Sequence, residues 1–200
     1  SVSPSGDGTV LAEVILDGGP IGAAFDPLTD QLFVSDWYNA RVWVLDGQSL
    51  ALKSTLATGG APAGLEVQGG ILASADRDAD QVSLFDTANG QLRHRITVGT
   101  RPFGLGFAPD GRLFVGNVGS NDVTVIDPTS GDILGTVPVG DRPYGVAFAQ
   151  GRAFVTNQYA DTVSVIDLAS LAPVTTLDVG EYPEGVDVTS DGQSLLVANW

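Results

Sequence analysis

The 200-residue sequence contains no cysteine, no methionine and a single histidine, His94. Without cysteine the chain can form no disulfide, no thiolate nucleophile and no zinc–sulfur site. The lack of methionine leaves no initiator residue, so we expect either a processed N-terminus or a missing start.

Positive charge is also scarce, because 9 Lys and Arg residues face 24 Asp and Glu residues, for a net charge of −15. Nucleic acids and anionic membranes attract clustered cations, so this balance argues against both as partners. No apolar run approaches the roughly 20 residues that a membrane helix needs, and we expect no membrane span. A hydrophobic fraction of 43% indicates a folded chain rather than a disordered one.

A Pro-x-Gly triplet recurs five times, starting at residues 20, 62, 102, 143 and 183. Each triplet precedes the same signals: a short strand, a turn, a strand ending in Asn or Asp, a polar loop, a strand ending in Asp, and a fourth strand. Four strands in about 40 residues is the size of one β-propeller blade. We therefore predict an all-β protein, a β-propeller of four-stranded antiparallel blades. Pro138 and Pro173 fall in fourth strands, which suits an outermost edge strand.

Residues 154–157 (Phe-Val-Thr-Asn), residues 163–167 (Val-Ser-Val-Ile-Asp) and the triplet at 183–185 resemble the YVTN-type β-propeller repeat. That resemblance covers essentially the whole chain. It implies kinship with exported and cell-surface propellers, and more distantly with lactonases and the large subunits of quinone-dependent amine dehydrogenases. It also implies a location outside the cytoplasm: periplasmic, cell-surface or secreted.

The repeats predict a single domain over residues 1–200. Residues 20–61, 62–101, 102–142 and 143–182 form complete repeats. Residues 183–200 would supply strands one and two of a fifth blade, and residues 1–16 its strands three and four. Such sharing would close the ring and remove exposed strand edges. The alternative is a fragment of a seven-bladed propeller, which is the usual ring of the family that the repeats resemble.

In such blades, the loops between strands two and three share one face with the connections from strand four to the next strand one. Aromatic residues and arginines gather in these loops, and they are the usual anchors of interfaces. We predict a binding face made of Trp37, Tyr38, Arg77, Arg101, Phe103, Arg142, Tyr144, Tyr159, Tyr182 and Trp200. In the alternative, the rings pack between blades and the arginines pair with neighbouring carboxylates.

Two acidic residues break the pattern of small residues expected on the innermost strands. Glu66 and Asp187 stand where other repeats have Ala24, Gly106 and Ala147. They are candidates for binding a channel cation such as calcium, against the alternatives of pairing with an arginine or simple solvation. No further cofactor is predicted. Because the remaining Asp and Asn residues recur once per repeat at strand ends, we interpret them as turn residues.

No Gly-x-Ser-x-Gly elbow, phosphate-binding loop, dinucleotide fingerprint or His-rich metal motif occurs, and we assign no catalytic residue. The favoured function is a non-enzymatic, exported binding or assembly scaffold. Its partner would be a protein, a small molecule or a glycan, and the chain would suit a subunit of a larger complex. Two alternatives remain: a channel-centred enzyme of lactonase or dehydrogenase-subunit type, and a structural component of a surface layer or filament.

Overall fold

The computed structural model describes residues 10–200, and its strands form four four-stranded antiparallel sheets and one two-stranded sheet. We number the four-stranded sheets as blades 1 to 4. Blade 1 contains β1 (Pro20–Asp26), β2 (Gln31–Asp36), β3 (Arg41–Asp46) and β4 (Leu52–Ala57), and blade 2 contains β5 (Pro62–Gln68), β6 (Ile71–Asp76), β7 (Gln81–Asp86) and β8 (Leu92–Thr97). Blade 3 contains β9 (Pro102–Phe107), β10 (Leu113–Asn117), β11 (Asp122–Ile126) and β12 (Ile133–Pro138), and blade 4 contains β13 (Pro143–Ala149), β14 (Arg152–Asn157), β15 (Thr162–Asp167) and β16 (Pro173–Asp178). The hairpin of β17 (Val186–Val188) and β18 (Leu195–Val197) follows, and a short 3-10 turn, η1 (Arg77–Ala79), lies between β6 and β7.

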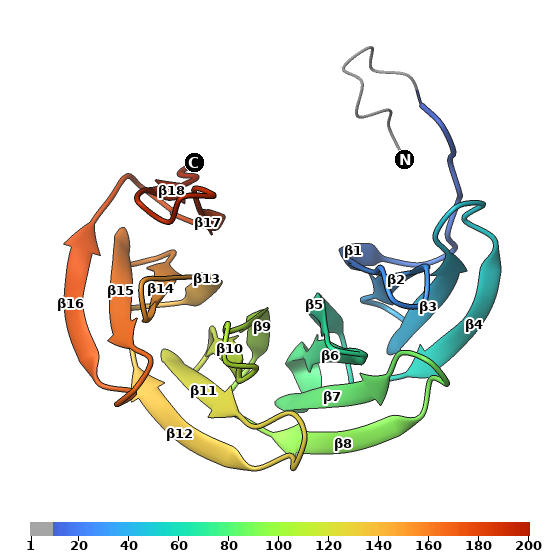
Figure 1. The fold of residues 1–200 in the computed structure, drawn as a ribbon, viewed down its shortest axis with the longest axis horizontal. Helices are drawn as coiled ribbons and strands as arrows, with labels where there is room; N and C mark the ends of the chain where they lie inside the picture. The colour runs from blue at the N-terminus through green and yellow to red at the C-terminus, as the bar shows by residue number, and fades with distance from the viewer. Residues whose placement is uncertain (1–9) are drawn as a thin grey trace.

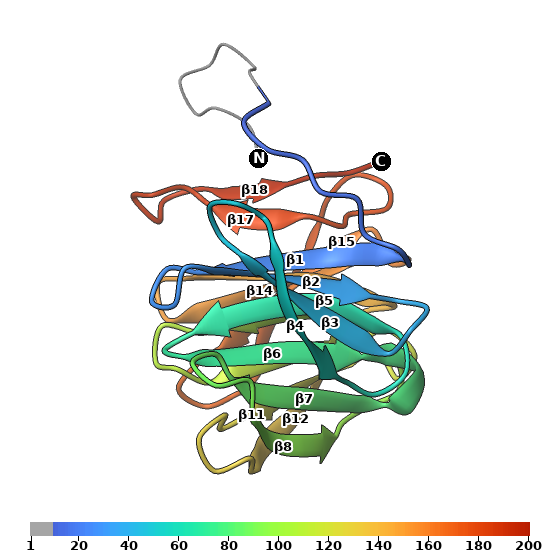
Figure 2. The same cartoon turned by 90° about the vertical axis from the view of Figure 1, so that its right-hand side faces the viewer.

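The blades are arranged radially, with β1, β5, β9 and β13 nearest the centre and β4, β8, β12 and β16 at the rim (Figure 1). Figure 2 shows the same blades from the side. This confirms the predicted propeller of four-stranded antiparallel blades. Pro138 and Pro173 lie in the outermost strands β12 and β16, where a missing N–H donor costs no interior ladder bond.

Apolar side chains on facing blades form the cores between them. The core between blades 2 and 3 includes Leu84 and Leu113, and the core between blades 3 and 4 includes Phe114 and Ile166; all four are fully buried. The middle strands of the blades are almost continuously buried, because sheets in the arc pack against neighbours on both faces; the buried residues include Ser and Thr as well as apolar side chains.

The motif glycines let neighbouring innermost strands approach closely. A Cβ on any of them would collide with the backbone carbonyl of the middle motif residue of the next blade; these glycines are Gly22, Gly64, Gly104 and Gly145. Hydroxyl groups reinforce the contact, since Ser35 Oγ donates to the Ala63 carbonyl at 2.8 Å. The Pro-x-Gly repeat is therefore a device for packing one blade against the next.

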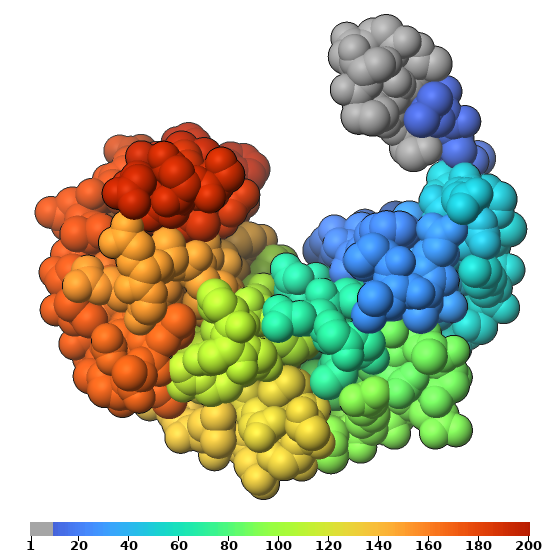
Figure 3. Space-filling view, in the orientation of Figure 1, coloured from blue at the N-terminus to red at the C-terminus, as the bar shows by residue number. Residues whose placement is uncertain are grey.

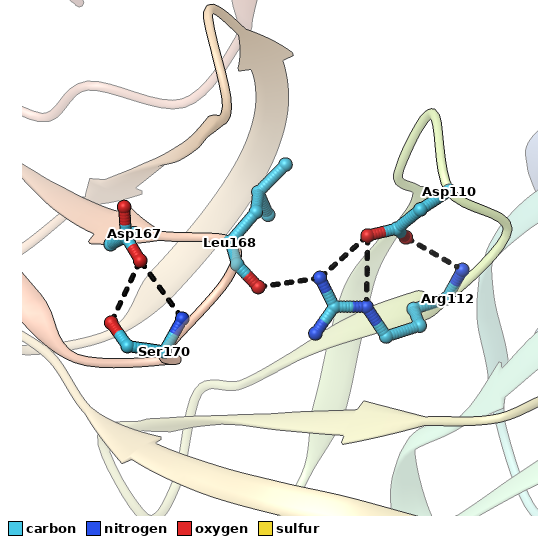
Figure 4. Close-up of polar contacts among 5 residues, drawn as sticks. All are labelled: Asp110, Arg112, Asp167, Leu168 and Ser170. Atoms are coloured by element: carbon cyan, nitrogen blue, oxygen red, sulfur yellow. Dashed lines mark hydrogen bonds and ion pairs between the residues drawn. The ribbon is translucent and has the colours of Figure 1, made fainter.

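A second link joins blades 3 and 4 on the opposite face of the propeller. Arg112 Nη2 donates to the carbonyl oxygen of Leu168 at 2.6 Å and pairs with Asp110 at 2.6 Å (Figure 4). Arg112 immediately precedes β10, and Leu168 immediately follows β15. One guanidinium thus ties the turns of two blades together.

The described residues form an open arc rather than the closed ring we favoured from the sequence. Blade 1 and the β17–β18 hairpin lie at opposite ends of this arc, and the space-filling view shows the opening between them (Figures 1 and 3). β17 and β18 pair only with each other, and residues 11–19 contain no strand. The predicted shared blade is therefore not formed by residues 10–16; residues 1–9, which were also assigned to it, lie outside the described part.

The course of residues 10–16 gives the physical reason. Leu16 packs against the buried Trp43 and Leu45 of blade 1. Val10 and Val14 line an apolar pocket of about 780 Å³ together with residues of the same blade. The segment therefore lies against blade 1 through Leu16, away from the free edge of β18, and Val10 and Val14 stay partly exposed. Within residues 10–200, no helix has the length and hydrophobicity needed to cross a membrane.

Candidate binding face

The loops of the predicted binding face are held by a hydrogen bond that repeats from blade to blade. A carboxylate or amide oxygen in one β2–β3-type turn accepts from the backbone N–H of the residue before the next motif proline. The three bonds join Asp80 to Arg101 at 2.7 Å, Asn121 to Arg142 at 3.0 Å and Asp161 to Tyr182 at 2.9 Å. Each bond crosses from one repeat to the next, so it fixes how successive loops lie relative to one another.

This bond compensates for an unfavourable backbone conformation. Arg101, Arg142 and Tyr182 have φ values of 55°, 59° and 48°, in the left-handed region that non-glycine residues rarely adopt. Each also precedes a proline, which disfavours helical dihedrals further. Ala61 adopts the same conformation in the first repeat, with a φ of 50°, so the connection itself imposes this backbone and the side-chain bond adds to its stability in the later repeats. These bonds were not predicted from the sequence, although Asp80, Asn121 and Asp161 stand 41 and 40 residues apart; the first repeat carries Ala40 at the equivalent position.

The strained backbone presents the side chains of Arg101 and Arg142 from adjacent blades to one pocket of about 400 Å³. Its walls are Arg77, Arg101, Val118, Gly119, Asn121, Asp141, Arg142 and Tyr159. Four of the ten predicted face residues are therefore brought together, and they come from three blades.

The arginines of this pocket differ in their partners. Arg77 pairs with Asp78 at 2.6 Å and lies over the Trp37 ring, 5.4 Å from its centroid. Arg142 Nη1 donates to the Tyr159 hydroxyl at 2.6 Å, and its guanidinium lies 4.6 Å from the centroid of that ring. Over residues 10–200, neither Arg101 nor Arg142 forms an ion pair, and Arg142 Nε is buried without a hydrogen-bond partner. Two positive charges thus face the pocket without a carboxylate on either guanidinium.

A second group of predicted residues forms an aromatic cluster where the innermost strands begin. The Phe103 ring lies 4.5 Å from that of Tyr144 and 6.3 Å from that of Trp37, centroid to centroid. Trp37 belongs to blade 1 and Phe103 to blade 3, so the contact spans two non-adjacent blades. Burial, and next the charge of Glu184, raise the pKa of the Tyr144 phenol above its ordinary value. Gln158 Nε2 donates to Glu184 Oε1 beside this cluster.

The remaining predicted face residues lie outside the pocket walls. Tyr182 makes an edge-to-face contact with Tyr159 at 6.1 Å and is half exposed. Tyr38 and Trp200 expose 79% and 85% of their surfaces. Of these three rings only Tyr182 touches a wall residue; Tyr38 lies in blade 1 and Trp200 follows β18, so neither is placed beside the pocket.

The structure does not bring the two candidate channel acids together. Glu66 lies in β5 opposite Ala73, which belongs to the core between blades 2 and 3, so its carboxyl group faces that interface. Burial raises its pKa, and one backbone hydrogen bond opposes the rise. Asp187 is exposed in β17 and accepts from the Val188 N–H at 2.7 Å. Among residues 10–200, no group of three or more His, Asp or Glu residues could hold a metal ion.

The recurring acids at strand ends do make turn hydrogen bonds. Asp167 Oδ1, for example, accepts from the Ser170 N–H and hydroxyl at 2.8 and 2.7 Å (Figure 4). Asp36 and Asp76 do more, because they are buried and accept from the N–H groups of Gly19 and Gly59 in the preceding connections. These two buried carboxylates thus fix the connections at Gly19 and Gly59 to the second strand of the following blade.

Their pKa values shift in opposite directions. Burial raises the pKa of Asp36, but hydrogen bonds from Gly19, Asn39 and Arg41 outweigh it, and the net shift is downward. Burial raises the pKa of Asp76 more than its hydrogen bonds from the Ser83 hydroxyl and the Gly59 N–H lower it. Asp76 is more deeply enclosed than Asp36, so burial outweighs its hydrogen bonds and the charge of Arg95, whereas Asp36 also pairs with Arg41 at 2.7 Å.

Radial four-stranded blades with close-packed innermost strands define a β-propeller. A family model for YNCE-like beta-propellers matches residues 35–200, and the chain belongs to this family. Among solved structures, the chain is similar to a chain of hydrazine synthase from Kuenenia stuttgartiensis, with a TM-score of 0.80 and 24% sequence identity. The match covers 93% of this chain and 57% of that one, and it shows the fold alone. No curated protein matches the sequence.

Proposed function

We propose that this propeller is a non-enzymatic binding scaffold that holds its ligand at the loop face, in the pocket walled by Arg101, Arg142 and Tyr159. The observation that carries the proposal is that two guanidiniums without an ion pair among the described residues, those of Arg101 and Arg142, converge on one pocket of about 400 Å³. In a chain with a net charge of −15, abundant carboxylates are available to neutralise such groups. Arginines left without ion pairs in that setting are suited to an external anionic group.

The rigidity of the loops supports the same proposal. Binding residues are characteristically placed on loops that a rigid scaffold positions. Here the repeated bonds from Asp80 and Asn121 hold Arg101 and Arg142 in a strained conformation before any ligand arrives. Such preorganisation reduces the entropy lost on binding. The neighbouring Trp37–Phe103–Tyr144 cluster offers an apolar surface to a ligand larger than the pocket.

The enzyme alternative has less support from the geometry. It relied on Glu66 and Asp187, which lie on β5 and β17, with Glu66 at the interface between blades 2 and 3 and Asp187 exposed. We also propose that the scaffold works outside the cytoplasm, on the resemblance of its repeats to exported propellers. A place in a larger complex is compatible with the exposed aromatic rings of Tyr38, Tyr159 and Tyr182.

The test is thermal unfolding of the purified chain with a panel of defined small molecules: neutral sugars, sugar acids, di- and tricarboxylates, phosphate and sulfate. We expect at least one compound to raise the melting temperature of the wild type. The shift should disappear in the Arg101→Gln/Arg142→Gln double variant and persist in the control Arg152→Gln, an exposed arginine of β14 outside the pocket walls. The proposal fails if no compound raises the melting temperature, or if the double variant responds like the wild type.

A further inference from the structure

The walls of the pocket carry a defined balance of charge. Arg77, Arg101 and Arg142 contribute three positive charges to the walls, and Asp141 contributes one negative charge. Two further acids lie beside these arginines, because Asp78 pairs with Arg77 and Asp80 accepts from the Arg101 N–H. With both counted, the local positive charge is small, which suits a monoanion better than a phosphate dianion.

We propose that the pocket binds a hydroxylated monocarboxylate, of the chemical class of the uronic acids. The carboxylate would lie between Arg101 and Arg142, and the hydroxyl groups would face Asp141. This inference rests on the proposed function, because it names the ligand class of that same pocket.

Arg142 is the residue that favours a carboxylate. Its Nη1 is occupied by the Tyr159 hydroxyl at 2.6 Å, while its Nε is buried and has no partner among the described residues. Nε itself is covered by the protein, so the groups left for a ligand are Nη2 and the second N–H of Nη1. That planar edge of the guanidinium matches the two oxygens of a carboxylate. Arg101, which is exposed and free of ion pairs, can approach the same group from the adjacent blade.

Asp141 is the residue that favours hydroxyl groups on the ligand. Its Oδ1 accepts from Asn121 Nδ2 at 2.9 Å, which leaves Oδ2 as an acceptor within the pocket wall. The Asp141 carboxylate can accept hydrogen bonds from hydroxyl groups of a ligand, but it repels a multiply charged ligand such as a phosphate dianion. The amide of Asn121 is already used, because its Oδ1 accepts from the Arg142 N–H.

The volume of the pocket agrees with a ligand of monosaccharide size. About 400 Å³ lies within the usual range of small-molecule pockets and exceeds the volume of a simple inorganic anion. The half-exposed Tyr159 ring, with Arg142 over it, adds an apolar wall for the C–H groups of a sugar ring.

The test is isothermal titration of the wild-type chain with glucuronate and galacturonate, with glucose and inorganic phosphate as comparisons. We expect both sugar acids to bind, and glucose, which has the hydroxyls without the carboxylate, to bind at least about tenfold more weakly. Arg101→Gln and Arg142→Gln should each weaken glucuronate binding about tenfold or more, since each removes a charge-assisted hydrogen bond. Arg142→Lys should weaken it too, because lysine keeps the charge and loses the planar edge. Arg152→Gln should bind like the wild type.

Asp141→Asn separates the proposed class from a phosphate ligand. The asparagine oxygen would accept from Asn121 as Oδ1 of Asp141 does, so an amide NH2 would replace the charged acceptor Oδ2. We expect glucuronate binding to weaken because its hydroxyl groups lose that acceptor, and phosphate binding to strengthen because a repulsive charge is removed. Tighter binding of phosphate than of either sugar acid, with the same dependence on Arg101 and Arg142, would overturn the ligand class and leave the proposed function standing. Failure of both acids to bind also overturns the inference, and failure of the whole panel overturns the proposed function with it.

Discussion

The guanidinium of Arg142 lies over the ring of Tyr159, 4.6 Å from its centroid, and donates a hydrogen bond to the hydroxyl of the same residue at 2.6 Å. The two residues come from consecutive loops on the same face, 17 positions apart in the chain. The ring therefore orients the guanidinium through two contacts of different kinds. In the proposed site, this fixes which edge of Arg142 remains for a ligand.

The first prediction concerns this hydroxyl. Tyr159→Phe keeps the ring and removes the acceptor for Arg142 Nη1, so Arg142 loses one of its two orienting contacts. We expect severalfold weaker binding of glucuronate and a loss of stability of no more than about 1 kcal/mol, because the bond is exposed to solvent. Titration and urea unfolding measure the two effects. Tyr38→Phe is the matched control, since that tyrosine is exposed and outside the pocket walls, and the change should alter neither quantity.

The second prediction concerns the packing of the innermost strands. Gly104→Ala would push a Cβ into the carbonyl oxygen of Tyr144. Neither residue can move away easily, because the backbone of each is held within a β-sheet. We expect a loss of about 2 to 3 kcal/mol in the free energy of unfolding, measured by urea denaturation.

Gly185→Ala is the control for this substitution. Gly185 occupies the same position of the Pro-x-Gly motif at the end of the arc. A Cβ added there would meet only the Cβ of Ala198, at an ordinary contact distance of 3.6 Å. The change should cost less than about 1 kcal/mol. Equal losses in the two variants would contradict the explanation of the motif glycine as a site of close approach between blades.

The third prediction concerns the bond that holds the strained connections. Asp80→Ala removes the acceptor for the Arg101 N–H and should lower stability by about 1 kcal/mol. Hydrogen exchange at the Arg101 amide should accelerate, while the Arg142 amide, held by Asn121, should exchange as in the wild type. The fold itself should persist, because blade 1 carries Ala40 at the equivalent position and the backbone of Ala61 still adopts a φ of 50°. Unchanged exchange at Arg101 would show that the bond does not maintain this conformation.

The fourth prediction concerns the pH dependence contributed by Glu66. Burial raises the pKa of this carboxyl above its ordinary value of 4.5, so the folded chain binds more protons than the unfolded chain just above that pH. Stability from this group is therefore present in acid and lost as the pH rises through the raised pKa. We expect Glu66→Gln to be more stable than the wild type at neutral pH and equal to it below pH 4.5.

Urea unfolding at several pH values measures this difference. Asp76, whose pKa burial also raises, stays in both proteins, so its contribution cancels in the comparison. Glu13→Gln, a change at an exposed carboxylate, provides the control and should leave the pH profile unaltered. A Glu66→Gln profile parallel to that of the wild type would refute the buried-carboxyl explanation.

The order of strands within a blade was predictable from the sequence because it depends on short-range signals. Turn glycines, aspartates at strand ends and β-branched runs recur every 40 residues or so, and they specify one four-stranded sheet at a time. The edge positions of Pro138 and Pro173 followed from the missing N–H of proline alone. The enrichment of the loop face in arginine and aromatic residues was also predictable, because the repeat of about 40 residues places the corresponding loops of successive blades on the same face.

The contacts between one repeat and another were revealed only by the tertiary structure. The Trp37–Phe103 contact spans two non-adjacent blades, the Arg101–Arg142 pocket lies between neighbouring ones, and residues 10–16 cover blade 1 instead of reaching β18. Each depends on the angle between successive blades, which the packing of large side chains in the cores between them sets. No single repeat encodes that angle, so the sequence determined the blades, while the packing between blades determined the arc and the pocket on its face.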